Sequence, residues 1–351
     1  MQNLTPCYNT SNWTCNFEAD GYHLPTEAQW ERAAAWSTAD SGRHYRYGTS
    51  ADCITCNTAS HSTSSSGDDI CNPLGLITYP KTTPVGYFPD SPSPAGCYDM
   101  TGNVFEMCND YWYREYTADP VVDPTGPAPS SWRVIRGGSY FTLYQYYRTT
   151  HRDVTQPTTQ VNGLGFRVAR SIGITGEGEG EGEGSFTPGA MVPIDESTFK
   201  MGDPWDEGDG DERPVHDVTL SAFSIGKYEV TNQEYAYVLN WADMQGYLTT
   251  ASSITADAFG VQLLHVGDAD CQLTWDSSQY IVESRDTYSM AMHPVVEVSW
   301  YGAAAYCNWL SELQGLQPCY NTSTWLCDFT KNGYYLPTEA HNGNVPRPGV
   351  P

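Results

Sequence analysis

The residues with the clearest chemical potential are two carboxylates on either side of a glycine-containing turn. The stretch GCYDMTGNVFEMCNDYW at 96–112 contains Asp99-x-x-Gly102-x-Val104-x-Glu106. Calcium takes six to eight oxygen ligands at about 2.3–2.6 Å, so Asp99 and Glu106 could close around an ion with backbone carbonyls between them. The alternative is a capped turn, in which Asp99 accepts local N–H groups and Glu106 pairs with an arginine.

Thiols are the second group that could do chemistry. The eleven cysteines are Cys7, Cys15, Cys53, Cys56, Cys71, Cys97, Cys108, Cys271, Cys307, Cys319 and Cys327. Cys53-x2-Cys56 together with Cys71 could suggest zinc, but a fourth ligand with suitable spacing is missing from the sequence. Disulfides or buried thiols are therefore the preferred interpretation. The histidines form neither His-x3-His nor His-Glu-x-x-His, so metallohydrolase chemistry has no support.

One segment of the chain occurs twice. Residues 6–28 and 318–340 match at 16 of 23 aligned positions. A repeat of this length at both ends predicts two partial copies of one domain, with the back part first. Each copy carries a Cys-x7-Cys loop, as Cys7/Cys15 and Cys319/Cys327. A local disulfide across each loop would imply an oxidising compartment, so we expect an extracellular or periplasmic location.

The repeat and a low-complexity tract define the organisation. We interpret residues 1–171 as the C-terminal part of a domain and residues 190–340 as the N-terminal part of a second copy. Residues 172–189 include an alternating Gly-Glu tract, which cannot bury apolar surface and repels itself, so they form a flexible linker. Residues 341–351 contain three prolines and are expected to form an irregular tail.

Three helix starts can be read from capping residues. Thr26 and Gln29 form a capping box directly after a proline, and Thr231 and Glu234 form a second one. Ser299 is expected to cap a third helix that follows a strand.

Strands are predicted from alternating apolar and polar residues. Residues 133–140 and 163–170 alternate like strands interrupted by glycines, and residues 191–203 suggest a strand pair. The acidic stretch 203–212 is expected to be a solvated face. Residues 245–290 have little periodicity and suggest a long surface excursion.

The composition limits the classes of partner. The chain has 351 residues and a formal net charge of −25, which repels phosphate backbones and anionic lipid, so we expect no nucleic-acid partner. No apolar run approaches the roughly 18 residues that a membrane helix needs. The 32 glycines, 23 prolines and 25 tyrosines favour a turn-rich fold with many short strands.

The blocks of this sequence resemble the formylglycine-generating enzyme family, also called the sulfatase-modifying-factor domain. The front half carries YEVTNQEY and HPVVEVSWYGAAAYCNWLS, and the back half carries LPTEAQWERAA, YDMTGNVFEM, RVIRGGSY and GFRVAR. The resemblance implies an irregular α+β, C-type-lectin-like fold with sparse secondary structure. The order of the halves would make it a circularly permuted domain.

The resemblance also implies metal ligands. Positions matching Asp99, Gly102, Val104 and Glu106 bind structural calcium in the family, the middle two through their carbonyls. A second family calcium site should begin near Asn57.

The catalytic centre of the family is altered in this chain. Alignment on GGSY places the two copper-binding cysteines of the enzyme at Thr142 and Tyr147, and Ser139 matches a functional serine. Cu(I) selects thiolate ligands, so we expect no copper here. The expected function is a non-redox extracellular binding or structural module. The alternative is a formylglycine-generating-type oxidoreductase, or another enzyme of the family, that acts on a peptide or small substrate.

A ligand surface and a mode of self-association complete the expectations. Aromatic residues gather at 111–116 and 140–147, where exposed rings suit binding and internal rings suit packing. In the family, the groove next to GGSY receives an extended peptide, so a peptide or protein ligand is expected. The two halves either dock within one chain or belong to a tandem array, and in the second case domain-swapped self-association is expected.

Overall fold

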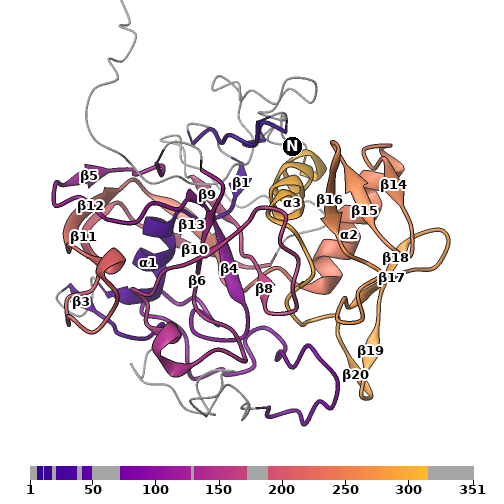
Figure 1. Cartoon of the computed structure of the whole chain (residues 1–351), viewed down its shortest axis with the longest axis horizontal. Helices are drawn as coiled ribbons and strands as arrows, with labels where there is room; N and C mark the ends of the chain where they lie inside the picture. The colour runs from indigo at the N-terminus through magenta and orange to yellow at the C-terminus, as the bar shows by residue number, and fades with distance from the viewer. Residues whose placement is uncertain are drawn as a thin grey trace, which may run out of the picture.

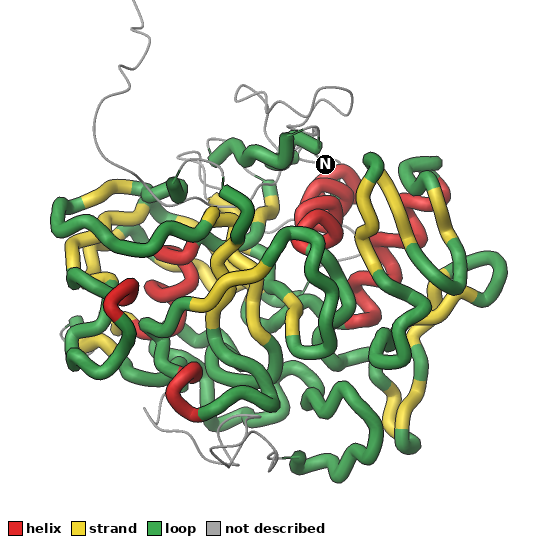
Figure 2. Tube along the Cα trace, in the orientation of Figure 1, coloured by secondary structure: helices red, strands yellow, loops and turns green. Residues whose placement is uncertain are grey.

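The computed structural model describes residues 6–10, 12–17, 21–37, 42–49, 72–127, 130–171 and 189–314. Helices are few in this part of the chain, and loops and turns join short strands (Figure 2). The predicted α+β class is confirmed. The loop that contains Asn57, Cys53, Cys56 and Cys71, nearly all of the linker, the second copy of the repeat and the tail lie outside the described residues.

Each α-helix begins where the sequence predicts. The helices are α1 (Glu27–Ala35), α2 (Asn232–Met244), α3 (Trp300–Leu313) and the short 3₁₀ helices η1 (Tyr144–Tyr147) and η2 (Gly210–Glu212). Thr26 and Thr231 form the predicted capping boxes, and Ser299 caps α3 by accepting a hydrogen bond from a backbone N–H of the first turn. These caps satisfy N–H groups that otherwise have no partner in a helix.

Two four-stranded sheets form the centre of the molecule (Figure 1). The first has the order β1 (Tyr22–His23), β9 (Ala169–Ser171), β13 (Phe223–Gly226) and β10 (Met191–Ile194). The second has the order β7 (Asp153–Thr155), β6 (Arg133–Arg136), β4 (Phe105–Tyr111) and β8 (Leu164–Gly165). All neighbours are antiparallel except β4 and β8.

Smaller sheets flank this centre on both sides in Figure 1. One side carries β11 (Ser197–Met201), β12 (His216–Leu220) and β5 (Val121–Val122), and the pair β2 (Trp36–Ser37) and β3 (Arg43–His44). The other carries the sheet β14 (Thr250–Ala251), β15 (Ala256–Ala258) and β16 (Val261–Leu264), and the pairs β17 (Leu273–Trp275) with β18 (Tyr280–Val282) and β19 (Ser284–Arg285) with β20 (Tyr288–Ser289).

Segments from both halves of the chain share sheets and core. In the first sheet, β9 of the back half pairs with β13 of the front half. Near the start of the chain, the rings of Tyr8 and Trp13 pack edge-on against Trp300 of α3, with centroids 5.5 and 6.0 Å away. The side chain of Asn308 bonds both the N–H and the carbonyl of Tyr8, at 3.0 and 3.1 Å. The apolar core is therefore built jointly by the two halves.

Two predictions about the front half need correction. The strands expected at 191–203 both form, but they do not pair with each other, because β10 pairs with β13 and β11 pairs with β12. The surface excursion expected at 245–290 is instead a set of short strands whose apolar side chains, including Leu263 and Tyr280, join the core. Strands of two to four residues are too short to produce a readable periodicity.

The acidic stretch 203–212 was expected to be solvated, and two of its carboxylates are not. Asp203 and Glu212 are 2% and 0% exposed. The carboxylate of Asp203 accepts hydrogen bonds from three backbone N–H groups of its own loop. Glu212 accepts two hydrogen bonds from Arg148, both at 2.7 Å. Burial is tolerated because each charge has hydrogen-bond donors.

The disulfide predicted between Cys7 and Cys15 is wrong for this structure. Tyr8 faces Cys15 in an isolated antiparallel bridge, and the N–H of Asn16 donates to the carbonyl of Cys7 at 3.0 Å. Cys7 is therefore opposite Asn16, and neighbouring residues of a strand point to opposite faces. The two thiols are on opposite sides of the bridge, where a disulfide cannot close. No disulfide joins any two of the described cysteines, and Cys319 and Cys327 are beyond them.

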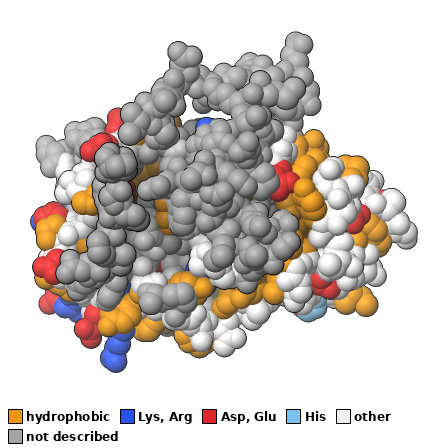
Figure 3. All heavy atoms as spheres, turned by 90° about the horizontal axis from the view of Figure 1, so that it is seen from above, with side chains coloured by type: hydrophobic (Ala, Val, Ile, Leu, Met, Phe, Trp, Pro, Cys, Tyr) orange, Lys and Arg blue, Asp and Glu red, His pale blue; other side chains and the backbone are white. Residues whose placement is uncertain are grey.

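The surface agrees with the charge of the sequence. Lys and Arg side chains are few on the visible part of the face shown in Figure 3. Among the described residues, no helix is both long enough and apolar enough to cross a membrane.

Candidate functional site

The structure brings Asp99, Gly102, Val104 and Glu106 together on the turn that enters β4. Asp99 and Gly102 have φ angles of 57° and 82°, which is the left-handed region that suits glycine and, among other residues, aspartate and asparagine. This backbone turns the chain tightly ahead of the strand. The Oδ2 atom of Asp99 accepts a hydrogen bond from the N–H of Gly86 at 2.6 Å.

Glu106 is fully buried and paired with an arginine. Its two carboxylate oxygens accept hydrogen bonds of 2.5 and 2.6 Å from Arg167, and the Nε1 of Trp30 donates to it at 2.8 Å. This arrangement is the arginine pairing of the alternative interpretation. Bidentate pairs of this kind are strong and fix the orientation of both groups.

A third carboxylate, Glu229, was not predicted from the sequence. It is 1% exposed and lies two residues before the cap of α2. The Nδ2 atom of Asn103 donates to it at 2.8 Å, and the N–H of Val104 donates at 3.4 Å. Glu229 therefore contacts the turn that carries the predicted calcium ligands.

The three carboxylates carry more negative charge than their neighbourhood balances. Burial raises the pKa of Asp99 to about 6, and the charge of Glu106 adds to this shift. Burial, Asp99 and Glu106 together raise the pKa of Glu229 well above its ordinary value. Arg167 is the cation that acts against both shifts. A buried site in which carboxylates hold protons in this way can exchange those protons for a cation.

Backbone oxygens of the same turn are available as ligands. Gly102 and Val104 are both buried, and no described residue donates a hydrogen bond to either carbonyl. Buried carbonyls without a donor are rare in proteins. The residues therefore fit a calcium ion held by carbonyl and carboxylate oxygens. Three carboxylate oxygens do not converge here within 4.8 Å, so carbonyls and water would supply part of the coordination.

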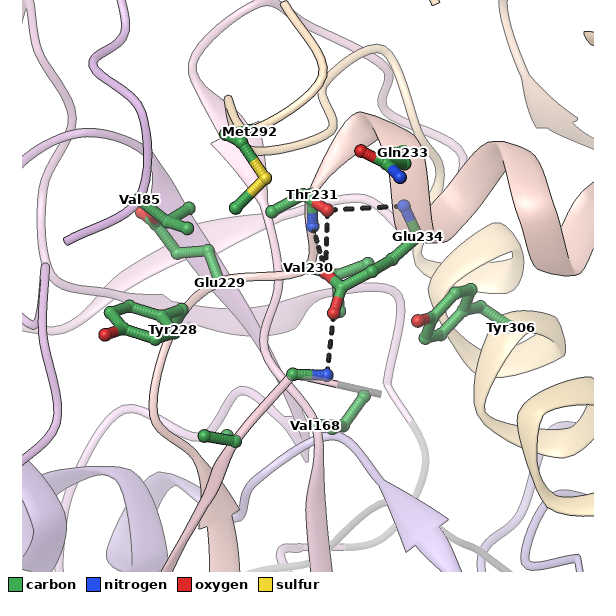
Figure 4. Close-up of a pocket in the computed structure, with 13 residues that line it drawn as sticks. Val85, Val168, Tyr228, Glu229, Val230, Thr231, Gln233, Glu234, Met292 and Tyr306 are labelled. Atoms are coloured by element: carbon green, nitrogen blue, oxygen red, sulfur yellow. Dashed lines mark hydrogen bonds between the residues drawn. The ribbon is translucent and has the colours of Figure 1, made fainter. Parts of the chain in front are cut away.

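A cavity of about 310 Å³ lies beside this group. Figure 4 shows Glu229 next to Val85 on one side of it and Tyr306 on the other. Its lining residues are Val85, Val168, Gly189, Ala190, Gly226, Tyr228, Glu229, Val230, Thr231, Gln233, Glu234, Met292 and Tyr306. Glu234 is occupied by the capping box of α2 and by the N–H of Gly189, so Glu229 is the carboxylate of this wall that is not part of a helix cap.

The positions expected to replace the copper ligands form a closed turn. The hydroxyl of Thr142 donates to the carbonyl of Ser139 at 3.0 Å and accepts from the N–H of Ser139 at 2.9 Å. The hydroxyl of Tyr147 lies between the carbonyls of Ser139, at 2.9 Å, and Thr142. At Gly138 (φ 73°), a Cβ atom would lie 2.5 Å from the ring of Tyr147, so only glycine allows this packing.

Backbone hydrogen bonds join the two turns. The N–H of Gly102 donates to the carbonyl of Gly137 at 2.9 Å, and the N–H of Tyr140 donates to the carbonyl of Asn103 at 2.9 Å. The ion-binding candidates and the Ser139 turn are therefore one connected piece of structure.

Aromatic rings lie next to the Ser139 turn. Tyr140 is fully buried, and its ring centroid lies 6.2 Å from that of Tyr79 and 5.0 Å from that of Phe141. Tyr79 and Phe141 are 44% and 37% exposed. We call Tyr79, Tyr140 and Phe141 the aromatic surface. In the other predicted aromatic stretch, Tyr113 is exposed while Tyr116 is buried in the core.

Two parts of the sequence match the same known protein family. The family model described as "Sulfatase-modifying factor enzyme 1-like domain" matches residues 7–172 and again residues 179–343. The formylglycine-generating enzyme of Streptomyces coelicolor is 34% identical over 166 residues, which cover 44% of this chain and 48% of that protein. The serine/threonine-protein kinase pkn1 of Chlamydia pneumoniae is 34% identical over 155 residues, which cover 43% of this chain and 21% of that protein.

A solved structure gives a weaker likeness. Treponema denticola variable protein 1 has 30% sequence identity and a TM-score of 0.33, with 44% of this chain and 49% of that chain covered. The chain thus spans about half of the length of the bacterial formylglycine-generating enzyme and a smaller share of the kinase.

Proposed function

The chain belongs to the sulfatase-modifying-factor family, and within this family we propose that it is a non-redox binding module. Calcium holds its loops, and the aromatic surface contacts a peptide or protein ligand. The observation that carries this proposal is the closed turn at Ser139, in which Thr142 and Tyr147 supply hydroxyl groups to backbone carbonyls. The family resemblance assigns the copper-binding thiols to these two positions.

The residues at this turn do not fit copper. Cu(I) prefers soft thiolate ligands, whereas Thr142 and Tyr147 offer hydroxyl oxygens that already bond the backbone. The nearest cysteine on each side in the sequence does not replace them. Cys108 and Cys271 are buried, and burial raises the pKa of the Cys108 thiol well above its usual range and that of Cys271 to about 12. Both are protonated thiols near neutral pH and therefore poor copper ligands.

The turn at Asp99, unlike the Ser139 turn, offers oxygen ligands that fit calcium. The carbonyls of Gly102 and Val104 have no described donor, and Asp99 supplies a carboxylate with a raised pKa. Glu106 completes the set that the family resemblance assigns, and its pairing with Arg167 would have to adjust when an ion binds. Glu229 adds a carboxylate from the front half of the chain. An ion here would replace repulsion between carboxylates by attraction.

The aromatic surface is proposed to bind the ligand because two of its rings are exposed and because it lies next to the Ser139 turn. Tyr79 and Phe141 expose rings on either side of buried Tyr140, and the Nζ of Lys81 lies 5.0 Å from the ring of Tyr79. Rigid aromatic side chains give contact area at low cost in conformational entropy. In the family resemblance, the groove beside this turn takes an extended peptide. The surface therefore suits a peptide or protein segment.

We also propose that residues 1–171 and 190–340 complete one circularly permuted, C-type-lectin-like domain within a single chain. Support comes from polar contacts between the halves. The Nε of Arg32 donates to the hydroxyl of Ser197 at 2.9 Å, and Glu31 accepts from the N–H of Gly202 at 2.8 Å. Mass measurement and limited proteolysis test this proposal. A cooperative monomer cut only near residues 172–189 and at one end would support it, and polydisperse oligomers would contradict it.

Cu(I) binding and the O₂-dependent oxidation of a peptide thiol are the two measurements that test the functional proposal. Purified chain is titrated with Cu(I) and then given a cysteine-containing peptide with O₂. We expect no stoichiometric copper binding and no aldehyde product, with the Streptomyces relative as a positive control. Stoichiometric Cu(I) and conversion of the peptide thiol to an aldehyde would overturn the proposal in favour of the enzyme alternative. The extracellular or periplasmic location stays a prediction, and it no longer has support from a Cys7–Cys15 disulfide.

A further inference from the structure

We propose a second cation site, in which His265, Asp268 and Glu297 bind a divalent first-row metal ion. One ligand atom of each side chain lies within 4.8 Å of the others. Atoms around one metal ion are separated by at most twice a metal–ligand distance of about 2.0–2.4 Å. The spacing of the three side chains is therefore that of a coordination sphere, and they come from two separate segments.

The backbone holds these segments together. Leu264, at the end of β16, forms an isolated bridge with Val298, and the N–H of His265 donates to the carbonyl of Glu297 at 3.0 Å. A turn then carries Asp268 back toward His265, whose Nδ1 lies 3.9 Å from the Oδ2 of Asp268. Because the contacts are made by the main chain, the positions of the ligands do not depend on long flexible side chains alone.

The buried carboxylate of Glu297 is the feature that points to a bound ligand. Glu297 is only 3% exposed, yet no described residue donates a hydrogen bond or an ion pair to its carboxylate. Burial, together with the charges of Asp268 and Asp270, raises the pKa of Glu297 to about 7, and no cation acts against this shift. A buried charge without a donor is costly. A bound metal ion would supply the missing positive charge.

In a second cluster of possible metal ligands, the buried carboxylate already has hydrogen-bond donors. His151, Asp209 and Glu212 also place ligand atoms within 4.8 Å of one another. There, Glu212 receives two hydrogen bonds from Arg148 at 2.7 Å and one from the hydroxyl of Thr150 at 2.7 Å. Although burial acts in the opposite direction, these contacts and His151 lower the pKa of Glu212 to about 2. That carboxylate is already neutralised, so this cluster serves as an internal control.

The donor set selects the kind of ion. Imidazole suits first-row transition metals, and carboxylate oxygen suits manganese as well as calcium and magnesium. One imidazole with two carboxylates therefore fits Mn²⁺ or a similar ion better than calcium alone. The side chains of His265 and Asp268 are 42% and 38% exposed, which leaves one side of the site open. The charges of Asp270 and Glu297 act on Tyr140, so the ion would lie near the aromatic surface.

The test measures Mn²⁺ binding to the full chain by electron paramagnetic resonance. Excess Ca²⁺ is present to fill the calcium turn. We expect one bound Mn²⁺ with nitrogen hyperfine coupling from an imidazole. His265→Gln should remove the nitrogen coupling. Glu297→Gln should weaken binding by about tenfold to a hundredfold, since replacing even an outer partner of a metal ligand costs this much. Asp209→Asn, in the control cluster, should change neither quantity.

Folding is checked on the same proteins. In metal-free buffer near neutral pH, Glu297→Gln should melt at or above the temperature of the wild type, because it removes a buried charge without a partner. Mn²⁺ should raise the melting temperature of the wild type and of Asp209→Asn by more than that of Glu297→Gln. The proposal is overturned if the wild type binds no Mn²⁺, if Glu297→Gln binds it equally well, or if the bound ion shows no nitrogen coupling.

Discussion

Asp99→Asn is the substitution that most directly separates calcium binding from a merely capped turn. Asparagine tolerates the left-handed backbone at this position (φ 57°), and its side-chain oxygen can still accept the hydrogen bond from Gly86. The change therefore removes one charge and little else. The exposed carboxylate Asp119 provides the matched control, Asp119→Asn.

The magnitude follows from the pKa of Asp99. The folded protein raises this pKa from 3.8 to about 6, so the fold holds the proton more tightly than the unfolded chain does. The wild type therefore loses stability as pH rises from about 4 to about 6, and the loss is complete above that window. At about 1.4 kcal/mol per pKa unit, the loss is at most about 3 kcal/mol. Asp99→Asn avoids it.

Calcium should offset this loss in the wild type. A ligand at about a hundred times its Kd stabilises the folded state by about 2.7 kcal/mol, which corresponds to a rise of several degrees, at roughly 2–4 °C per kcal/mol for domains of this class. We expect Asp99→Asn to melt higher than the wild type in chelator at about pH 8, and to match it near pH 4. Calcium should raise the melting temperature of the wild type and of Asp119→Asn, but not that of Asp99→Asn.

The assay is thermal melting followed by tryptophan fluorescence, with and without calcium, across this range of pH. The reasoning is refuted if calcium shifts Asp99→Asn as much as the wild type. It is also refuted if the difference between the two proteins in chelator does not change with pH.

Three further predictions concern a contact between the halves, a buried ion pair and the second copy of the repeat. Asn308→Ala leaves the N–H and carbonyl of Tyr8 without their partner, so it should cost about 1–3 kcal/mol in urea unfolding and open residues 6–28 to protease; unchanged cleavage would contradict it. Arg136→Met should cost about 3–5 kcal/mol, because it leaves Glu31 buried without its guanidinium; a variant as stable as the wild type would show that the pair is dispensable. Deletion of 315–351 removes the second copy of the repeat, while the first copy already packs against α3, so the shortened chain should keep its melting temperature and be a monomer; a lower melting temperature or dimers of the shortened chain would contradict this.

Helix caps and turns could be predicted from the sequence because the residues that form each of them are close together in the chain. The caps at Thr26, Thr231 and Ser299 each need only residues within one helical turn, and each was placed correctly. Asp99 and Glu106 are also close in sequence, and the structure shows for Glu106 the arginine pairing of the alternative interpretation.

Contacts between residues far apart in the sequence could not be predicted. Glu229 comes 130 positions after Asp99 in the sequence, and only the docking of the two halves brings them together. His265 and Glu297 are joined by a main-chain hydrogen bond next to the Leu264–Val298 bridge, and neither contact has a sequence signature. The Cys7–Cys15 prediction failed by one residue of register, because Tyr8 and not Cys7 faces Cys15. A shift of one position reverses the face of a strand residue, and spacing alone cannot detect it.

The two turns at Gly102 and Ser139 explain how the fold can lose redox chemistry and keep its shape. A copper centre needs thiols at 142 and 147, but the turn itself needs only donors for the carbonyl of Ser139, and Thr142 and Tyr147 are such donors. The turn proposed to bind calcium uses neither side chain, and it is tied to the Ser139 turn through main-chain hydrogen bonds. On the proposed function, substitution at 142 and 147 would remove the copper chemistry selectively, while the aromatic surface stays anchored to the turn proposed to bind calcium.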